Sequence, residues 1–404
     1  MKSLSLPALL GLVLAAVPAP ACAPAPMRGE YVEITNETAL IVWDKDTKVE
    51  HFIRRANFQS TSPDFGFLVP TPSQPELAEA DESVFDALAQ YTAPKIEYRT
   101  VRKPRPRPRE DATRDFPAAA AGPAPKSAPR GVEVLEETEV GGQEAVVLKF
   151  RRGPKSDVAE DAKELAEWLK KRGYEFGPQL ANWLKPYIAN DWVLTAFRIA
   201  KRVTVNTGPG PATARPAINE MQGKAVRMSF KTETPFYPYR EPEAPAVEPK
   251  KPGNWYSPGR FLRVFLMTNE RGAATLGEKG PTWAATSPWS DKLNENQMQG
   301  VATKLKVSAD LLKNATWLTE FEDRSSPRRG TDEVYFWPNS EIAPVHRPVI
   351  VREVVEYYDA PEEAGPGSDP EAKTPYWVVL VAVIGGVAFL SILGGLIFVM
   401  ARSR

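Results

Sequence analysis

The sequence contains very little cysteine and histidine. Cys22 is the one cysteine in 404 residues, and the two histidines are His51 and His346. Because Cys22 falls in or directly after an N-terminal leader, the rest of the chain has no disulfide and no thiol nucleophile, so an apolar core must stabilise it. Two histidines without a thiolate also disfavour a zinc site. We therefore predict no metal and no cofactor.

The chain also lacks the short motifs of common catalytic sites. It has no H-E-x-x-H, no G-x-S-x-G and no S-x-x-K pattern, which excludes the usual metalloprotease and serine-nucleophile arrangements. The glycine-containing stretches at 208–213 and 223–225 lack residues that a phosphate loop needs. Lys plus Arg and Asp plus Glu number 51 each, so no global charge directs the chain to nucleic acid. We predict no catalytic residue of these classes and no nucleic-acid partner.

Two apolar segments at the ends of the chain predict its location. Residues 1–23 carry Lys2 near their start, continue with an apolar run and end in small residues, the layout of a signal peptide; lipidation of Cys22 is the alternative to simple cleavage. Residues 376–400 carry no charge and are long enough for a transmembrane helix. The positive-inside rule places the tail, residues 401–404, in the cytoplasm. We predict a single-pass membrane protein whose N-terminal part is periplasmic or at the cell surface.

Small residues recur inside this predicted span. Ala382 and Gly386 are four positions apart, as are Ser391 and Gly395. Such pairs let two transmembrane helices approach closely. They predict a homodimer contact, with the ordinary occurrence of small residues in spans as the alternative.

Forty prolines, concentrated in a few stretches, divide the sequence. We place a first β-rich module at 27–100, a Pro/Arg-rich disordered linker at 101–131, an α+β module at 132–240, a Pro-rich loop at 241–258, a second β-rich module at 259–359 and a juxtamembrane spacer at 360–375. The linker has few residues able to form a core. Its Arg105, Arg107 and Arg109 alternate with proline, which favours an extended linker or, alternatively, a basic arm for anionic envelope polymers.

Periodicity within the modules predicts an α+β fold that is rich in strands, with a few helices and one C-terminal transmembrane helix. Period-two alternation predicts a hairpin over 31–58, a second about Gly141 and Gly142, and strands in 260–268, 317–321, 334–336 and 349–358. Helical spacing predicts one helix that Asp157 caps, with Leu165, Trp168 and Leu169 on its apolar side. Further helices are expected at 179–188 and in 76–92, the latter with Leu77, Val84, Phe85 and Leu88 on one face.

Several segments, in a consistent order, resemble the bacterial domain of unknown function 2330 family. They are ALIVWD, EHFIRRANF, FGFLVPTPSQPEL, VFDALAQYTAP, VEVLEETEVGGQEAVVL, ELAEWLKKRGY, PYIANDWVLTAFRI, VRMSFKTETPFYPYR and WLTEF. The resemblance covers about residues 30–325 and implies an exported protein, often with one C-terminal span. It implies no activity and no catalytic residue. The long proline-rich arm at 101–131 departs from the family pattern.

The stretch DKDTKVEH at 44–51 suggests either a calcium loop or a hairpin turn. Asp44, Asp46 and Glu50 supply carboxylates, but the stretch has no glycine and no twelve-residue loop, which an EF-hand site needs. Strand alternation also points Glu50 and His51 to opposite faces. We predict a turn in which Asp44 and Asp46 bond to the backbone; a calcium-stabilised adhesin is the weaker alternative.

Aromatic residues flanked by Pro, Ser and Asn mark the last module. Such rings either stack on a sugar or protein partner or anchor a loop from inside. We predict a non-catalytic binding or assembly module of the cell envelope, with an envelope protein or glycan as partner. The predicted contact residues are Trp255, Tyr256, Trp283 and Trp289, with Arg105, Arg107 and Arg109. The alternative is an envelope glycan hydrolase whose paired carboxylates come from Glu320, Glu322 and Asp332.

Overall fold

The computed structural model describes residues 23–26, 30–104, 132–150, 157–172, 178–200, 218–242, 259–325, 332–339, 341 and 343–358. The chain divides into two compact units, Met1–Glu97 with Ala112–Arg352 and Tyr98–Asp111 with Glu353–Arg404. The predicted signal peptide, linker, Pro-rich loop, spacer and span lie wholly or for the most part outside the described residues. Within those residues, no helix is long and apolar enough to cross a membrane.

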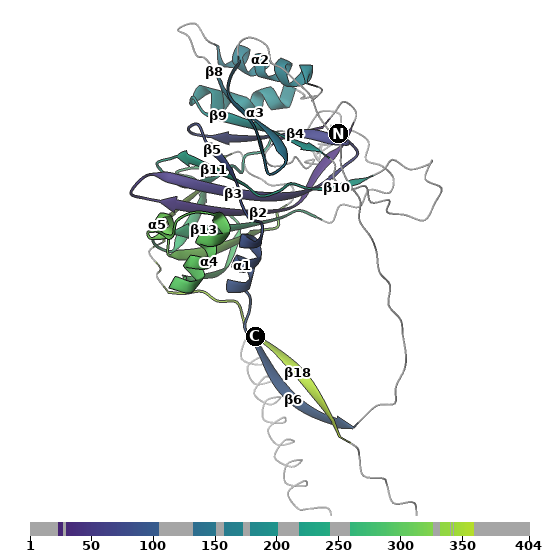
Figure 1. Ribbon diagram of the computed structural model, residues 1–404, viewed down its shortest axis with the longest axis vertical. Coiled ribbons are helices and arrows are strands. Elements are labelled where there is room, and N and C mark those ends of the chain that lie inside the picture. Colours follow the sequence, from purple (N-terminus) through teal and green to yellow (C-terminus); the bar gives the residue numbers. More distant parts are fainter. Residues whose placement is uncertain are drawn as a thin grey trace, which may run out of the picture. The chain divides into compact units, whose positions relative to one another are not determined.

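Two sheets form the centre of the larger unit (Figure 1). The five-stranded sheet has the order β1 (Ala23–Pro26), β4 (Asp64–Thr71), β9 (Val193–Ala200), β8 (Gln143–Phe150) and β7 (Val132–Val140). The eight-stranded sheet has the order β15 (Thr286–Lys292), β16 (Trp317–Asp323), β13 (Phe261–Thr268), β2 (Val32–Asp44), β3 (Val49–Ser60), β11 (Val226–Lys231) and β5 (Glu76–Glu79), with β10 (Asn219–Gln222) also beside β3. Neighbours are antiparallel except β13 and β2, which run parallel.

Two smaller sheets complete the strands. One has the order β12 (Phe236–Tyr237), β17 (Val334–Pro338) and β14 (Gly272–Leu276). The other has only two strands, β18 (Ile350–Tyr358) and β6 (Ile96–Pro104); we call this pair the ribbon. The boundary between the two compact units crosses both strands of the ribbon.

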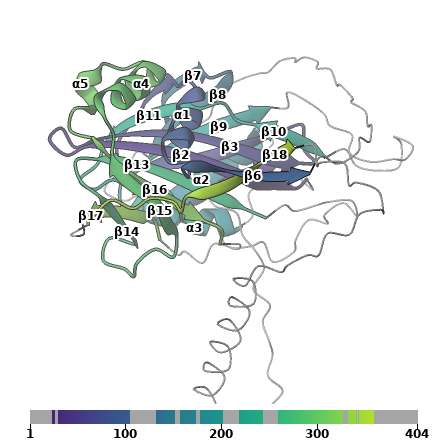
Figure 2. The same cartoon turned by 90° about the horizontal axis from the view of Figure 1, so that it is seen from below.

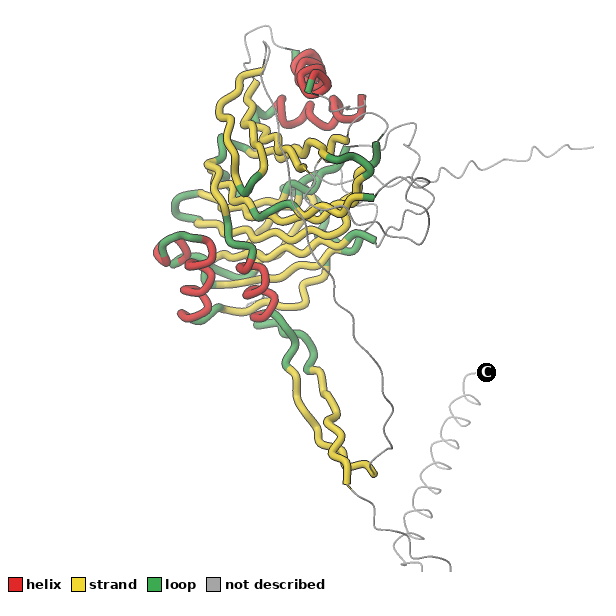
Figure 3. Tube along the Cα trace, turned by 45° about the vertical axis from the view of Figure 1, so that its right-hand side comes forward, coloured by secondary structure: helices red, strands yellow, loops and turns green. Residues whose placement is uncertain are grey.

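Helices cover the outer faces of the two large sheets, which gives the larger unit four layers (Figures 1 and 3). The helices are α1 (Ser83–Tyr91), α2 (Val158–Lys171), α3 (Pro178–Ala189), α4 (Glu295–Leu305) and α5 (Ala309–Leu312). α2 and α3 pack on the five-stranded sheet through one apolar cluster. α1, α4 and α5 pack on the eight-stranded sheet through another, and the view from below shows α4 and α5 together at one end of its strands (Figure 2).

Strand alternation explains why the eight-stranded sheet buries both faces. On β2, Ala39 and Ile41 point into the core between the sheets, whereas Leu40 and Val42 point to the helices. All four side chains have no exposed surface. We call the face of the eight-stranded sheet that carries Ala39 and Ile41 the inner face. The candidate site lies on this face.

The structure confirms a strand-rich α+β fold and most of the local elements. The hairpin of β2 and β3, the turn at Gly141 and Gly142, and α2 are all present. Asp157 caps α2 by accepting a hydrogen bond from the Ala159 N–H at 2.7 Å. Trp168 lies on the buried side of this helix, as its spacing predicted.

Two expectations differ from the structure. Residues 76–92 are not one helix: β5 pairs with β11, placing Leu77 opposite Met228, and the helix begins only at Ser83. Strand β11 offers backbone hydrogen bonds to residues 76–79, and these outweigh the weak helical periodicity of that segment. The three predicted modules are also not separate bodies, because β2, β11 and β13 come from different modules and share one sheet.

Asn294→Ala is expected to lower the free energy of unfolding by about 1 kcal/mol. The Asn294 side chain accepts from the Gln297 N–H, and the Gln297 side chain accepts from the Asn294 N–H, both at 2.9 Å. This capping box satisfies two N–H groups at the start of α4. Urea unfolding checks the value, with Asn294→Asp as the control that keeps a cap; equal stability of N294A and wild type would contradict it.

Candidate functional site

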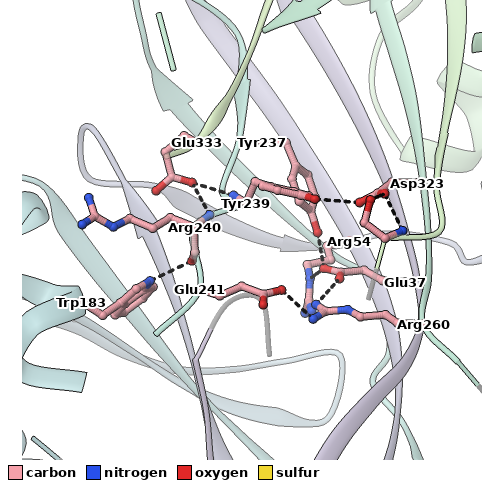
Figure 4. A network of polar contacts seen from close by, with 11 residues as sticks. Glu37, Arg54, Trp183, Tyr237, Tyr239, Arg240, Glu241, Arg260, Asp323 and Glu333 are labelled. Atoms are coloured by element: carbon pink, nitrogen blue, oxygen red, sulfur yellow. Dashed lines mark hydrogen bonds and ion pairs between the residues drawn. The ribbon is translucent and has the colours of Figure 1, made fainter. Parts of the chain in front are cut away.

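Glu37 is a carboxylate buried between the two large sheets. Alternation on β2 places it on the inner face with Ala39 and Ile41, and it is 1% exposed. Glu37 Oε1 accepts hydrogen bonds from Arg54 Nε and from the Tyr237 hydroxyl, both at 2.5 Å (Figure 4). Because a lone carboxylate is costly in an apolar interior, these bonds make the burial of Glu37 tolerable.

Arg54 reaches from β3 across the space between the sheets. Its guanidinium lies 4.0 Å from the ring centre of Phe67 on β4, a cation–π contact. It also lines a cavity of about 30 Å³ together with Phe58 and Gln143. Such a volume holds about two water molecules and is well below the roughly 300 Å³ of a small-molecule pocket. The cavity therefore suits solvent better than an organic ligand.

Arg260 joins a second carboxylate to Glu37. Arg260 Nη2 is 3.4 Å from Glu37 Oε2, and Nη1 donates to Glu241 at 2.7 Å. The side chains of Arg260 and Glu241 are only 8% and 3% exposed. These two residues flank 243–258, which lie outside the described residues, so their ion pair connects the chain on both sides of that segment.

Tyr239 binds a third carboxylate. Its hydroxyl donates to Asp323 Oδ2 at 2.9 Å, and Asp323 Oδ1 accepts from the Ser325 N–H at 2.8 Å. Asp323 is the last residue of β16 and is 2% exposed. Tyr237 and Tyr239 thus carry their hydroxyls from one short segment to two different carboxylates, Glu37 and Asp323.

Glu333 lies directly before β17 and binds three donors. Its Oε1 accepts from the Tyr187 hydroxyl at 2.5 Å, and its Oε2 accepts from the N–H groups of Tyr239 at 2.6 Å and Arg240 at 3.0 Å. Burial raises the pKa of Glu333 to about 7, although these hydrogen bonds and the Arg240 charge act to lower it. Both oxygens are bonded and the residue is 4% exposed. Glu333 therefore joins α3 to the chain at 239–240.

We call these side chains the buried polar network: Glu37, Arg54, Tyr187, Tyr237, Tyr239, Glu241, Arg260, Asp323 and Glu333. Its carboxylates face arginines, tyrosines and backbone N–H groups, which is an arrangement that holds strands and α3 together (Figure 4). No sequence motif predicted this network. The available signal was an acid at the position of an apolar residue, since Glu37 shares strand parity with Ala39 and Ile41.

Two of the three carboxylates of the hydrolase alternative, those of Glu320 and Glu322, belong to an ion-pair cluster. Arg347 Nη2 lies 2.9 Å from Glu320 and 2.7 Å from Glu322, and Arg263 lies 3.0 and 3.3 Å from the same two groups. Burial acts to raise the pKa of Glu322, but the hydrogen bond and charge of Arg347, with those of Arg263, leave it lowered. A glycosidase acid needs a raised pKa. Asp332 accepts from the Glu333 N–H at 2.9 Å.

The stretch DKDTKVEH forms a hairpin turn, as predicted; of its two aspartates, Asp44 bonds to the backbone as expected, whereas Asp46 binds the Asn314 side chain. Asp44 accepts from the Asp46 N–H at 3.0 Å and from the Thr47 hydroxyl at 2.9 Å. Asn314 donates its side-chain amide to Asp46 at 2.9 Å and to Asp44 at 3.3 Å. Among the residues described, no group of three or more His, Cys, Asp or Glu side chains is arranged to hold a metal ion.

Glu50 and His51 lie on opposite faces of β3, as strand alternation predicted. Glu50 has no exposed surface, and its Oε2 accepts the Phe236 N–H at 2.9 Å. Burial raises the pKa of Glu50 well above its ordinary value. Burial, together with the charge of Arg227, lowers the pKa of His51 to about 4, so His51 is neutral at pH 7.

Two of the predicted contact aromatics are core residues. Trp283 is 5% exposed and packs against Tyr239 and Phe321, with ring centroids 5.6 and 5.9 Å apart. Trp289 is 8% exposed and packs in the cluster beneath α4. Their rings anchor loop and strand from inside, so the prediction that they face a partner is wrong. Trp255, Tyr256, Arg105, Arg107 and Arg109, and the small residues Ala382, Gly386, Ser391 and Gly395, lie outside the described residues.

Exposed apolar side chains gather on the ribbon instead. Six large apolar residues are exposed in the described part of the chain, and all lie on β6, on β18 or directly before β18: Ile96, Tyr98, Val349, Ile350, Val351 and Val354. Tyr98 is 66% exposed and Val351 is 59% exposed. Strand alternation places Ile350 and Val354 on one face of the ribbon and Val351 on the other, and exposed apolar side chains that gather on one element are typical of an interaction surface.

The two strands of the ribbon run parallel. The Ile350 N–H donates to the Lys95 carbonyl oxygen at 2.8 Å, and Arg102 Nε donates to Glu356 at 2.9 Å. Both contacts join residues about 254 positions apart, and a constant separation is the mark of parallel pairing. The arrows of β6 and β18 likewise point the same way (Figures 1 and 2). This register places Thr100 beside Val354.

Comparison with protein families gives one match. The model of a family described as "Uncharacterized protein conserved in bacteria (DUF2330)" matches residues 17–250. Neither the curated proteins nor the solved structures give a match.

Proposed function

The chain belongs to the DUF2330 family of uncharacterised bacterial proteins, and from this premise we propose that it is a non-catalytic binding or assembly module of the cell envelope. Its contact surface is the ribbon of β6 and β18. One observation carries the proposal: the exposed large apolar side chains of the described residues are concentrated on these two strands.

The rest of the described structure supports a scaffold for that surface. The buried polar network and the Glu320–Arg347 cluster bond their carboxylates to arginines and tyrosines inside the fold, and the aromatics Trp283 and Trp289 fill the core. The ribbon, by contrast, presents Tyr98 and Val354 to its surroundings. The glycan hydrolase and the calcium adhesin have weaker support, since Glu322 has a lowered pKa and Asp44 and Asp46 bond within a turn and to Asn314.

The envelope location rests on the sequence. The signal-like residues 1–23 and the uncharged residues 376–400 support an N-terminal part outside the cytoplasm and one C-terminal membrane span. The partner in this proposal is therefore a protein at the outer surface of the same membrane.

Replacing Tyr98 and Val354 together by serine is expected to weaken the complex at least 100-fold, since each apolar side chain contributes roughly 1.5–3 kcal/mol when buried and every 1.4 kcal/mol is about tenfold. Native electrophoresis of mild-detergent extracts from membranes of the producing bacterium should show the wild-type chain above its monomer size and Y98S/V354S at monomer size. Thermal unfolding of both should agree, because the residues are exposed. The control is Lys163→Ser, an exposed change on α2; identical sizes for wild type and Y98S/V354S would sink the proposal.

A further inference from the structure

The ribbon is an incomplete sheet. Parallel strands normally occur with both faces covered, and two strands alone are marginally stable in water. In the described chain neither β6 nor β18 has another strand beside it, so each has one free edge of backbone donors and acceptors. An uncovered edge of this kind is a template for pairing with another chain.

The two edges differ in charge. Strand β6 carries Arg99, Arg102 and Lys103 near its end, followed by Pro104, which has no N–H to donate. Two copies of β6 side by side would bring positive charges together. Strand β18 instead carries Arg352 and Glu356 two positions on either side of Val354, and such a strand is complementary to itself when turned end for end.

We propose that β18 pairs antiparallel with β18 of a second copy of this chain, centred on Val354; this inference rests on the proposed function and names its partner. The pairing sets Val354 opposite Val354 of the second copy. It also sets Arg352 opposite Glu356 of the second copy, twice by symmetry, and opposite charges at directly facing positions stabilise a sheet. The result is a four-stranded sheet with the order β6-β18-β18-β6.

A two-fold contact between identical edges closes on itself as a dimer. Pairing of β6 with β18 of the next copy would also bring opposite charges together, but that head-to-tail contact leaves two edges free and extends into a filament. The length of the predicted spacer is compatible with this dimer. The C-terminal ends of two paired nine-residue strands lie about 27 Å apart at 3.3–3.4 Å per residue. A stretch as long as residues 360–375 can span about 50 Å when extended, so both copies can lead to the same membrane.

Disulfide trapping tests the pairing in the full-length chain in its membrane. Directly opposed residues of antiparallel strands have Cα atoms about 4.5–5.5 Å apart, within the range that a disulfide spans. Val354→Cys is therefore expected to give a dimer on a non-reducing gel after mild oxidation. Thr100→Cys is the matched control, because its two copies would lie three strand spacings, about 14 Å, apart. The wild-type chain, whose one cysteine is Cys22, is the control for a disulfide through that residue.

Charge reversal tests the register. Arg352→Glu sets like charges opposite each other twice and is expected to reduce the V354C dimer at least tenfold. Adding Glu356→Arg restores two opposite-charge pairs and should recover the dimer. A dimer through T100C instead of V354C, or one that R352E leaves unchanged, overturns the proposal.

The outcomes also separate this inference from the proposed function. If Y98S/V354S loses a larger complex but V354C gives no disulfide dimer, the ribbon binds a different protein: the proposed function stands and the second copy is wrong. If the ribbon variant keeps the size of the wild type and V354C gives no dimer, both are wrong. A V354C dimer with the expected charge dependence supports both.

Discussion

Glu37→Ala is expected to lower the free energy of unfolding by about 3–5 kcal/mol, the range for breaking a buried ion pair by removing one partner. Glu37 accepts from Arg54 and Tyr237 at 2.5 Å and faces Arg260 at 3.4 Å. Its removal leaves two arginine side chains, 11% and 8% exposed, without their shared carboxylate. A loss of this size is a large part of the 5–15 kcal/mol that stabilises a typical domain.

Urea unfolding of the full-length chain, followed by tryptophan fluorescence, measures this effect. Glu220→Ala is the matched control, because Glu220 is an exposed glutamate on β10 of the same sheet and such changes usually stay within about 0.5 kcal/mol. Glu37→Gln keeps the volume and one acceptor oxygen but removes the charge, so it should fall between E37A and wild type. A loss below about 1 kcal/mol for E37A would mean that the network contributes little to holding the sheets together.

Local elements could be predicted because their causes are local. The turn at 44–51 follows from Asp44, whose side chain binds the Asp46 N–H two residues on. The start of α2 follows from Asp157 in the same way. Each needs only neighbours within a few positions, and those neighbours are visible in the sequence.

The arrangement of strands could not be predicted in this way. Val264 of β13 lies beside Ala39 of β2 in parallel register, although they are far apart in the sequence and belong to two predicted modules. Nothing local marks the pairing, because the central residues of the two strands, 39–42 and 264–267, are apolar on both faces and would fit many neighbours. The same limit applied to Leu77, which pairs beside Met228 on β11 instead of continuing a helix.

One residue of the buried polar network, Glu37, could be recognised in the sequence, whereas the partners that bind it could not. An acid on the inner face of β2 could be recognised from the alternation around Glu37. Its partners Arg54, Tyr237 and Arg260 come from three other segments, and only the fold brings them together. The tryptophans show the converse case. Trp283 stands among loop-forming residues, yet Tyr239 and Phe321 enclose it, so local composition gave the wrong exposure.

Glu333→Gln is expected to remove one pH-dependent contribution to stability. Burial raises the pKa of Glu333 in the folded chain to about 7, against 4.5 for an ordinary glutamate. The folded state therefore holds this proton more tightly than the unfolded state, and the stabilisation is complete below pH 4.5 and lost as the pH rises through 7. A shift of this size corresponds to about 2–3 kcal/mol between pH 5 and pH 8. Glutamine imitates the protonated form: its oxygen accepts from the Tyr239 and Arg240 N–H groups, and its amide donates to the Tyr187 oxygen.

The measurement is urea unfolding of wild type and E333Q at pH 5 and pH 8. The two should agree at pH 5, and E333Q should be more stable by about 2–3 kcal/mol at pH 8. The variants are compared at each pH because His51 also makes stability depend on pH. Its pKa is lowered to about 4, so its contribution to the free energy of unfolding is lost as the pH falls from 6.5 to 4, the opposite direction to that of Glu333. Glu278→Gln removes an exposed carboxylate and is the control; it should change the free energy of unfolding by the same small amount at pH 5 and at pH 8. If E333Q is instead destabilised at both pH values, the carboxylate is ionised in the fold, and the Tyr239 and Arg240 N–H groups outweigh its burial.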